Sequence, residues 1–347
     1  MAHPHPIEGE VDDPLLGRIL DDRFRVVAPL GSGGMGSVYL AVQTGLERPV
    51  ALKVLPMGLA DRRDLAFVKR FCLEASVTAR LAHPNVVTVY DYGRTEDGIF
   101  YIAMELLEGR TLARVLAEEG PLPPARALGI ARQIAWAVRE AHRNGLVHRD
   151  LKPSNVMLLE RPGEPELVKV LDFGLARFYE GGAADPSHSG AFLGSPQYMA
   201  PELARGEKAT PRSDVYSLGV VLYEIVCGQP PFSADSQIGV ILEHASAQPR
   251  PPRLVDPRIP VELERAILTA LRKDPAARFP DMDAFLDALG GVGAPASGPM
   301  PLLAPAEVAA LEVGARRRAW RRRLAPWIVL AAAAGGAWAI ARHLLAG

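Results

Sequence analysis

The stretch His148-Arg-Asp-Leu-Lys-Pro-Ser-Asn155 decides the fold, and it follows a helical pattern that ends near Gly145. It brings an aspartate, a lysine and an asparagine into one short loop. Asp150 is placed to accept the proton of an attacking hydroxyl, Lys152 adds positive charge beside a transferred phosphoryl group, and Asn155 is a ligand for a divalent metal. We expect the histidine to pack in the loop and not to act as a base. The residue types and their spacing therefore indicate phosphoryl transfer.

A glycine-rich run lies upstream, between two predicted strands. A GxGxxG pattern alone more often indicates a dinucleotide fold or a plain hairpin turn, but a strand–turn–strand setting lets the glycine backbone fold over phosphates. Val38 would then pack on the adenine face of a nucleotide. The nucleotide-binding candidates in this run are Gly31, Ser32, Gly33, Gly34, Met35, Gly36 and Val38.

Lys53 follows on the next predicted strand, where a lysine among apolar residues needs an anionic partner. The α- and β-phosphates of ATP are one such partner. A carboxylate from the following helix is the other, and Glu74 is the only glutamate between Glu47 and Glu96. Ala51, on the same strand, is assigned to the nucleotide site. The alternative is an ordinary surface lysine and an ordinary surface glutamate.

Asp172 begins an Asp-Phe-Gly sequence at the end of a short apolar strand. Such a tripeptide alone would be read as a turn, but it comes after Asn155 in the order that a shared metal site requires. We expect Asp172 and Asn155 to hold Mg²⁺ that bridges the phosphates. Further along, we assign Arg278 as the cationic partner of Glu202.

The segment after Gly174 is polar and rich in glycine over residues 180–190. Ser187 and Ser189 are its candidate phosphorylation sites, because a phosphate on either could pair with Arg149.

Hydrophobic periodicity predicts an α+β protein. Strand-like runs occupy residues 23–30, 37–42, 49–55, 86–93 and 100–107, with one helix at 65–81 among them. Helical spacing follows at residues 111–119, 124–143, 213–228, 235–246 and 260–272. The sequence thus predicts a flexible leader over 1–22, a sheet-rich lobe over 23–108, a helical lobe over 109–289 and a linker over 290–315.

Composition excludes several classes of partner and compartment. The formal net charge is −1 across 347 residues, which gives no global reason to expect nucleic-acid binding. Cys72 and Cys227 lie far apart without metal-like spacing, as expected for reduced thiols in a cytosolic compartment. The first residues carry neither a basic region nor an apolar core, so no signal peptide is predicted.

The motifs between residues 24 and 289 together resemble the eukaryotic-like Ser/Thr protein kinases of bacteria. The resemblance implies a two-lobed fold with an antiparallel sheet and one helix in the first lobe and mainly helices in the second. It implies ATP and Mg²⁺, with Mn²⁺ as an alternative ion, and Ser/Thr-containing protein substrates. It also implies that Met104 is the gatekeeper, that Glu105 and Leu107 offer backbone hydrogen bonds to adenine, and that Asp214 steadies the catalytic loop.

Two departures from the family pattern concern nucleotide contacts and the substrate region. Gly194-Ser195 stands where the family usually has Gly-Thr, and the retained hydroxyl could still bridge Asp150 and Lys152. The hinge Glu105-Leu-Leu107 lacks an aromatic residue. We expect an active kinase of bacterial signal transduction that phosphorylates its own activation loop. A membrane-tethered pseudokinase scaffold is the alternative, whereas Ser195 and the Ala200-Pro-Glu202 segment argue against a small-molecule phosphotransferase.

The last part of the sequence predicts a single transmembrane helix. Residues 324–341 carry no charge, follow six arginines within 316–323 and precede a short tail at 342–347. The alternative is an alanine-rich soluble helix. The arginine excess places the preceding domain in the cytoplasm, with the protein crossing the cell inner membrane once. Small residues four apart also leave a homodimer open.

Overall fold

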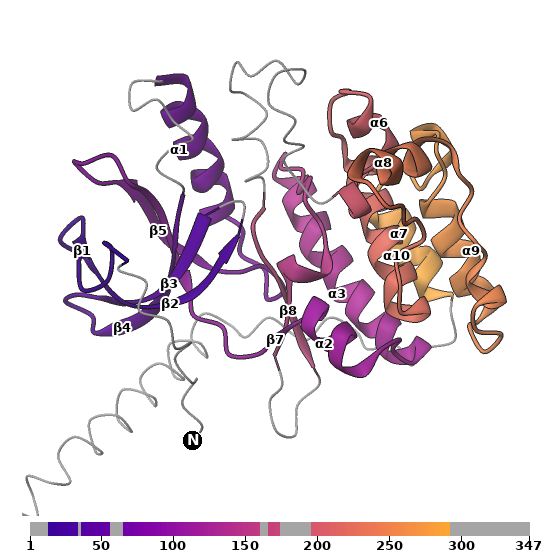
Figure 1. Cartoon of the computed structure of the whole chain (residues 1–347), viewed down its shortest axis with the longest axis horizontal. Coiled ribbons are helices and arrows are strands. Elements are labelled where there is room, and N and C mark those ends of the chain that lie inside the picture. The colour runs from indigo at the N-terminus through magenta and orange to yellow at the C-terminus, as the bar shows by residue number, and fades with distance from the viewer. Residues whose placement is uncertain (1–12, 34–35, 56–64, 160–165, 174–195, 292–347) are drawn as a thin grey trace, which may run out of the picture. The chain divides into compact units, whose positions relative to one another are not determined.

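The computed structural model describes residues 13–33, 36–55, 65–159, 166–173 and 196–291. All of them belong to the first of two compact units, which ends at residue 294. Strands dominate the first part of this unit and helices the second, as the ribbon shows (Figure 1). The two-lobed arrangement expected from the sequence is confirmed.

One antiparallel sheet forms the first lobe, with its strands in the order β1-β2-β3-β4-β6-β5. Its strands are β1 (Ile19–Leu20), β2 (Phe24–Gly33), β3 (Gly36–Gln43), β4 (Arg48–Val54), β5 (Val89–Arg94) and β6 (Phe100–Glu105). Side chains of a strand alternate between two faces. Accordingly Leu52 joins one buried cluster with Tyr101, whereas Ala51 joins another with Met104. The sheet is therefore buried on both faces at its centre.

Helix α1 (Leu65–Ala79) lies against β5. Its fully buried Phe71 places its ring 5.0 Å from that of Phe100 and 6.4 Å from that of Tyr92. The helix was predicted to run to Leu81 and ends two residues earlier.

The leader predicted over residues 1–22 is wrong for its second half. Leu20 is fully buried, and β1 pairs with β2. The hydroxyl of Tyr39 donates to Asp13 at 2.8 Å, and that of Tyr101 donates to Asp21 at 2.7 Å. Residues 13–22 therefore close one edge of the sheet, because apolar side chains there complete its core; residues 1–12 lie outside the described part.

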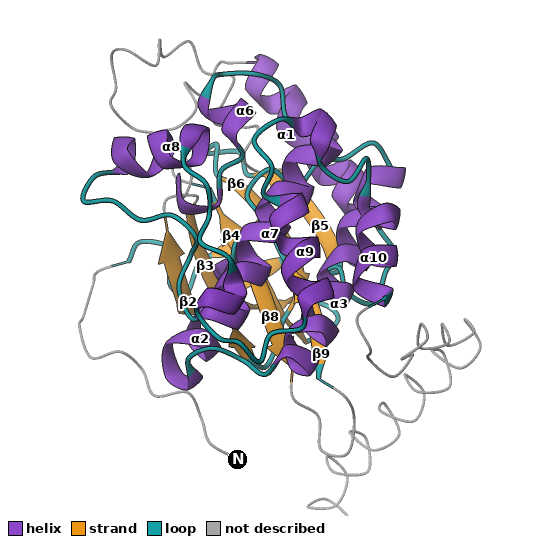
Figure 2. Cartoon of the chain, turned by 90° about the vertical axis from the view of Figure 1, so that its right-hand side faces the viewer, coloured by secondary structure: helices purple, strands orange, loops and turns teal. Residues whose placement is uncertain are grey.

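The second lobe holds a small sheet and most of the helices (Figure 2). The sheet has the order β7-β8-β9. The elements are β7 (Arg110–Thr111), α2 (Leu112–Glu119), α3 (Pro124–Arg143), β8 (Val156–Leu159), β9 (Leu167–Val170), α6 (Pro201–Ala204), α7 (Pro211–Cys227), α8 (Gln237–Ser246), α9 (Val261–Ala270) and α10 (Met282–Gly290). In the described part of this lobe, four short 3-10 helices join them at Pro153–Asn155, Pro196–Tyr198, Pro252–Leu254 and Pro275–Ala277.

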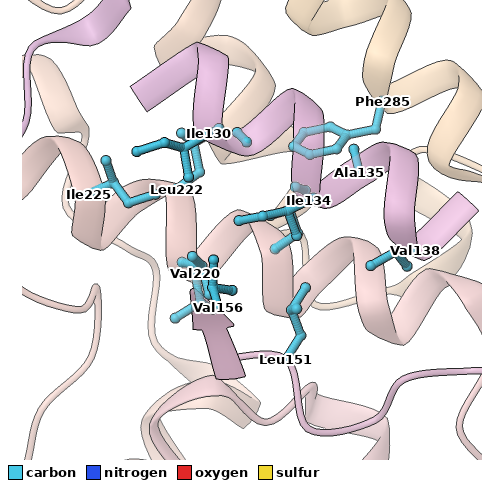
Figure 3. Packing of buried hydrophobic residues seen from close by; sticks show 14 of the residues in the cluster. Ile130, Ile134, Ala135, Val138, Leu151, Val156, Val220, Leu222, Ile225 and Phe285 are labelled. Carbon is cyan, nitrogen blue, oxygen red and sulfur yellow. The ribbon is translucent and has the colours of Figure 1, made fainter. Parts of the chain in front are cut away.

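Helix α7 is the centre of this lobe. A capping box between Thr210 and Ser213 starts it, and Gly228, with φ of 77°, ends it in the left-handed conformation that favours glycine. Almost every residue between is buried, and α3, α9 and α10 pack around it. Side chains from α3, α7 and α10 meet in one apolar cluster, with Ile134, Leu222 and Phe285 among them (Figure 3).

The two lobes are joined by backbone hydrogen bonds as well as by the chain itself. The N–H of Val87 donates to the carbonyl of Val170 at 3.0 Å, and the N–H of Val170 donates to that of Asn85 at 2.8 Å. The strand predicted at residues 86–93 begins instead at Val89, because its first residues pair with β9 of the other lobe.

Within the described ranges, no helix is both long and apolar enough to cross a membrane. The predicted transmembrane segment at residues 324–341 and the arginine-rich 316–323 lie outside those ranges.

Leu222→Ala should lower the free energy of unfolding by roughly 2–5 kcal/mol, because it removes buried methyl groups from a tightly packed site. Leu254→Ala is the matched control, since the same change at a side chain that is 65% exposed should stay within about 0.5 kcal/mol. Chemical denaturation measures both. Equal losses would contradict the packing described for α7.

Candidate active site

The glycine-rich run forms the hairpin between β2 and β3, with Gly33 opposite Gly36. Gly36 has φ of 118°, and a Cβ there would collide with the carbonyl of Val54. Glycine is thus required where the hairpin approaches β4. Gly34 and Met35 lie outside the described residues, whereas Gly31 and Ser32 are paired in the ladder with Val38 and Ser37.

Four of the predicted nucleotide-site residues gather on one apolar surface. Ala51 lies opposite Met104 in the β4–β6 ladder, and Val38 and Leu107 pack against the same buried cluster. Leu171 joins them from the other lobe and was not predicted. These side chains provide the kind of apolar face that a planar base requires.

Lys53 is 4% exposed, and its Nζ lies 2.7 Å from Oδ2 of Asp172. The ladder places Lys53 opposite Val38 on one side and Ile102 on the other. The side chain of Glu74, the predicted partner, lies outside the described part, although its backbone belongs to α1. Asp172 has φ of 58°, an uncommon conformation for a residue with a side chain. The predicted strand end thus brings the carboxylate of Asp172 to Lys53.

The loop at residues 148–155 assembles a compact polar group around Asp150. Nζ of Lys152 lies 2.7 Å from Oδ2 of Asp150, and Nδ2 of Asn155 donates to the same oxygen at 3.1 Å. The backbone carbonyl of Asn155 also accepts the N–H of Leu171 at 2.9 Å. This bond holds the loop beside the segment that carries Asp172.

Asp214 fixes this loop from α7 and is fully buried. Its carboxylate accepts the backbone N–H groups of His148 at 2.8 Å and Arg149 at 2.9 Å, and Nε2 of His142 lies 2.7 Å away. Burial alone would raise the pKa of Asp214, but the hydrogen bond from His142 and the other donors outweigh it and hold the pKa below its ordinary value. A buried carboxylate with three donors is a rigid anchor.

His148 is a packing residue, as predicted, and it lies against the segment that holds Leu171 and Phe173. It is fully buried, its Nε2 lies 2.9 Å from the carbonyl oxygen of Leu171, and its ring lies 4.7 Å from that of Phe173. Arg149 has φ of 70°, so the chain turns sharply before Asp150.

Asn155 and Asp172 offer oxygen donors that suit a divalent cation. Asp172 is a carboxylate, and Asn155 uses its amide nitrogen toward Asp150, which leaves its amide oxygen as the donor atom for a cation. Their segments are adjacent through the Leu171 bond. Among the described residues there is no group of three or more His, Cys, Asp or Glu side chains suited to a metal.

Glu202 and Arg278 form a buried bidentate pair. Both guanidinium NH groups donate to the carboxylate at 2.8 Å, and the hydroxyl of Ser213 adds a third donor at 2.7 Å. Burial opposes ionisation of Glu202, but the bonds from Arg278 and Ser213 prevail and lower its pKa. The predicted partner of Glu202 is therefore the observed one.

Sequence reasoning missed an ion pair at the link between the lobes. Nζ of Lys169, on β9, lies 2.6 Å from Oε1 of Glu105 and 3.1 Å from the carbonyl of Val86. The same carboxylate oxygen accepts the N–H of Thr88 at 2.7 Å. Lys169 stands in an apolar strand just as Lys53 does, so the same argument could have found it. The N–H of Glu105 donates to the carbonyl of Thr88 at 2.9 Å, so this backbone group is already used within the protein.

Comparison with known proteins decides the family. The protein kinase domain matches residues 24–285. The chain belongs to the protein kinase family. Ser187, Ser189 and Ser195 of this kinase lie outside the described residues.

Curated bacterial relatives share much of the kinase domain. The chain is 43% identical over 278 residues to the serine/threonine-protein kinase pkn3 of Myxococcus xanthus, covering 79% of this chain and 50% of that protein. It is 41% identical over 265 residues to PrkC of Bacillus subtilis, covering 76% and 40%. It is also 41% identical to PknB of Mycobacterium tuberculosis, covering 75% and 41%. The kinase therefore spans half or less of these relatives' length.

Solved structures show the same fold. The kinase domain of Mycobacterium tuberculosis PknI aligns with a TM-score of 0.62 and 32% identity, covering 79% of this chain and 97% of that one. Rad53 in complex with AMP-PNP aligns with a TM-score of 0.64 and 26% identity, covering 77% and 64%.

Acid should weaken the fold partly through Glu202. Its folded-state pKa lies below the ordinary 4.5, so its contribution to stability is complete above pH 4.5 and is lost as the pH falls through the folded-state pKa. Glu202→Gln should therefore flatten the decline of the free energy of unfolding below about pH 5. Glu262→Gln, at an exposed position on α9, is the control. An unchanged acid slope in the Glu202 variant would contradict the assignment.

Proposed function

We propose that this protein is a Ser/Thr protein kinase, which transfers the γ-phosphoryl group of ATP to Ser or Thr hydroxyls of proteins in bacterial signal transduction. One observation carries the proposal. Asp150 shares its carboxylate with Lys152 and Asn155, and a backbone bond holds that group beside Asp172, which pairs with Lys53. The relatives' names as serine/threonine-protein kinases support the substrate class.

The proton path starts at Asp150. Its carboxylate accepts the proton of the incoming hydroxyl as the oxygen attacks the γ-phosphorus, the bond to the bridging oxygen breaks and ADP leaves. Asp150 is 8% exposed and hydrogen-bonded by Asn155, so it is held in one orientation before the substrate arrives. Lys152 balances the negative charge that collects between the carboxylate and the phosphoryl group.

The nucleotide is held from two sides. The apolar surface of Val38, Ala51, Met104 and Leu107 takes the adenine, and the backbone of Glu105 and Leu107 gives it hydrogen bonds. Lys53 binds the α- and β-phosphates, and the glycine-rich hairpin covers them. Bound Mg²⁺, or Mn²⁺, would neutralise phosphate charge, and Asn155 and Asp172 would hold it.

Asp150→Asn and Lys53→Met should each reduce incorporation of labelled phosphate from ATP by about a thousandfold, because one removes the proton acceptor and the other the phosphate ligand. Asp287→Asn and Lys208→Met make the same chemical changes at exposed positions and should label normally. The readouts are autophosphorylation of the full chain and labelling of a basic Thr-containing peptide.

Undiminished labelling in both site variants would refute the kinase proposal. Nucleotide binding by the wild-type chain without any labelling would favour a pseudokinase scaffold. Mapping of the label tests whether Ser187 or Ser189 is the autophosphorylation site, with Arg149 as the proposed partner of the phosphate. Label confined to residues outside 180–190 would contradict that assignment.

We also propose a membrane tether at residues 324–341, with the kinase domain on the cytoplasmic side of the inner membrane. Eighteen uncharged residues after an arginine cluster support it. The full chain should sediment with membranes and require detergent for release, whereas a variant with Ile328, Leu330 and Ile340 changed to Lys should be released by buffer alone. Equal release would refute the tether.

Pairing of two tethered copies is part of the same proposal. Ala332 and Gly336 give the small-residue spacing that allows close helix approach. Crosslinking of membrane fractions should trap a homodimer, and its absence would remove this step.

A further inference from the structure

A buried histidine on α8 connects this helix to the segment that precedes Ala200. His244 is fully buried, and its Nε2 lies 3.0 Å from the carbonyl oxygen of Gln197. Its Nδ1 lies 2.8 Å from the hydroxyl of Tyr216 on α7. A carbonyl oxygen only accepts, so Nε2 carries the proton and Nδ1 accepts from the tyrosine. One neutral tautomer satisfies both contacts.

The surroundings of His244 keep this tautomer in place. The ring packs 4.8 Å from that of Phe232 and 5.7 Å from that of Tyr216. Burial, together with the charge of Lys273, lowers the pKa of His244 to about 4. The ring is therefore uncharged near neutral pH, and its two hydrogen bonds have fixed directions.

The short helix Pro196–Tyr198 is held at three points. His244 holds the carbonyl of Gln197, the hydroxyl of Ser217 donates to the carbonyl of Tyr198 at 2.8 Å, and the hydroxyl of Tyr198 donates to Glu224 at 2.8 Å. Ser217 and Glu224 both belong to α7, whereas His244 belongs to α8. Without His244, these contacts would tie the segment to a single helix.

Helix α7 also sets the position of the loop at residues 148–155. Asp214 holds the backbone before Asp150, and Ser217 lies three residues further along α7. The segment at 196–198 is thereby placed in a fixed relation to the proposed proton acceptor. Asp214 and Ser217 are about one turn apart on α7, so the backbone of Tyr198 lies close to the loop that carries Asp150. A polypeptide that presents its hydroxyl to Asp150 would therefore pass beside residues 196–198, if the protein acts as proposed above.

We infer that His244 is a positioning residue for the protein substrate, acting through the carbonyl of Gln197. It touches neither ATP nor the reacting atoms. Its loss should therefore change how a polypeptide docks and leave the nucleotide site as it is.

The test compares three full-chain variants. His244→Phe keeps an aromatic ring but cannot donate to Gln197. His244→Gln keeps an N–H donor that can reach the same carbonyl. Val138→Ala, in the buried part of α3, is a control for lost stability, because it removes methyl groups from the apolar core and no hydrogen bond to this segment.

His244→Phe should raise the KM for a basic Thr-containing peptide roughly five- to tenfold, while the KM for ATP changes by less than about twofold. His244→Gln should recover most of the peptide affinity, and Val138→Ala should leave both KM values unchanged. Equal effects on the peptide and ATP, or no effect of His244→Phe, would overturn the inference.

Hydrogen exchange supplies a readout that needs no catalysis. The backbone at residues 196–204 should exchange faster in His244→Phe than in Val138→Ala at matched melting temperature. Unchanged exchange there would overturn the inference even if the wild-type chain transferred no phosphate, whereas absent transfer with faster exchange would refute the kinase proposal alone.

Discussion

The carboxylate of Asp214 is the interaction on which the rest of the site depends. A fully buried negative charge is costly unless hydrogen bonds compensate it, and here two backbone N–H groups and His142 do so. Two of those donors, the N–H groups of His148 and Arg149, belong to the loop that carries Asp150. The geometry of the proposed proton acceptor is therefore set from the centre of the helical lobe.

Lysines in apolar strands provide a second shared constraint. Lys53 and Lys169 each stand in a buried strand, and each reaches a carboxylate that belongs to a different part of the chain. Burying a lysine is tolerated when its charge is paired and hydrogen-bonded. The two pairs link the sheet lobe to β9 and the residues after it, so strand packing and lobe contact depend on each other.

Much of the site could be predicted because its residues sit in local patterns. The loop at 148–155 and the long helix at 124–143 depend on short-range spacing, and both were found. Contacts that arise between distant segments could not be predicted in this way. The burial of Leu20 needs the strand it covers, and the bond from His244 to Gln197 needs two helices packed side by side. A lone histidine in an amphipathic helix gives no sign of its partner.

The link between the lobes has both of its ends attached to the same small sheet. At one end of the link, Glu105 is held by Lys169 on β9. At the other end, Arg110 pairs with Leu158 on β8, and a side chain at position 109 would collide with the Leu158 carbonyl, so glycine is required there. Such a link is not a freely rotating hinge, because it is a short segment fixed at both ends. A rotation of the sheet lobe must either pull the Glu105 carboxylate away from Lys169 or carry β9 along with it. Ionic strength weakens exposed ion pairs more than enclosed ones. It should therefore affect the relative movement of the lobes less than a molecule that binds against Glu105.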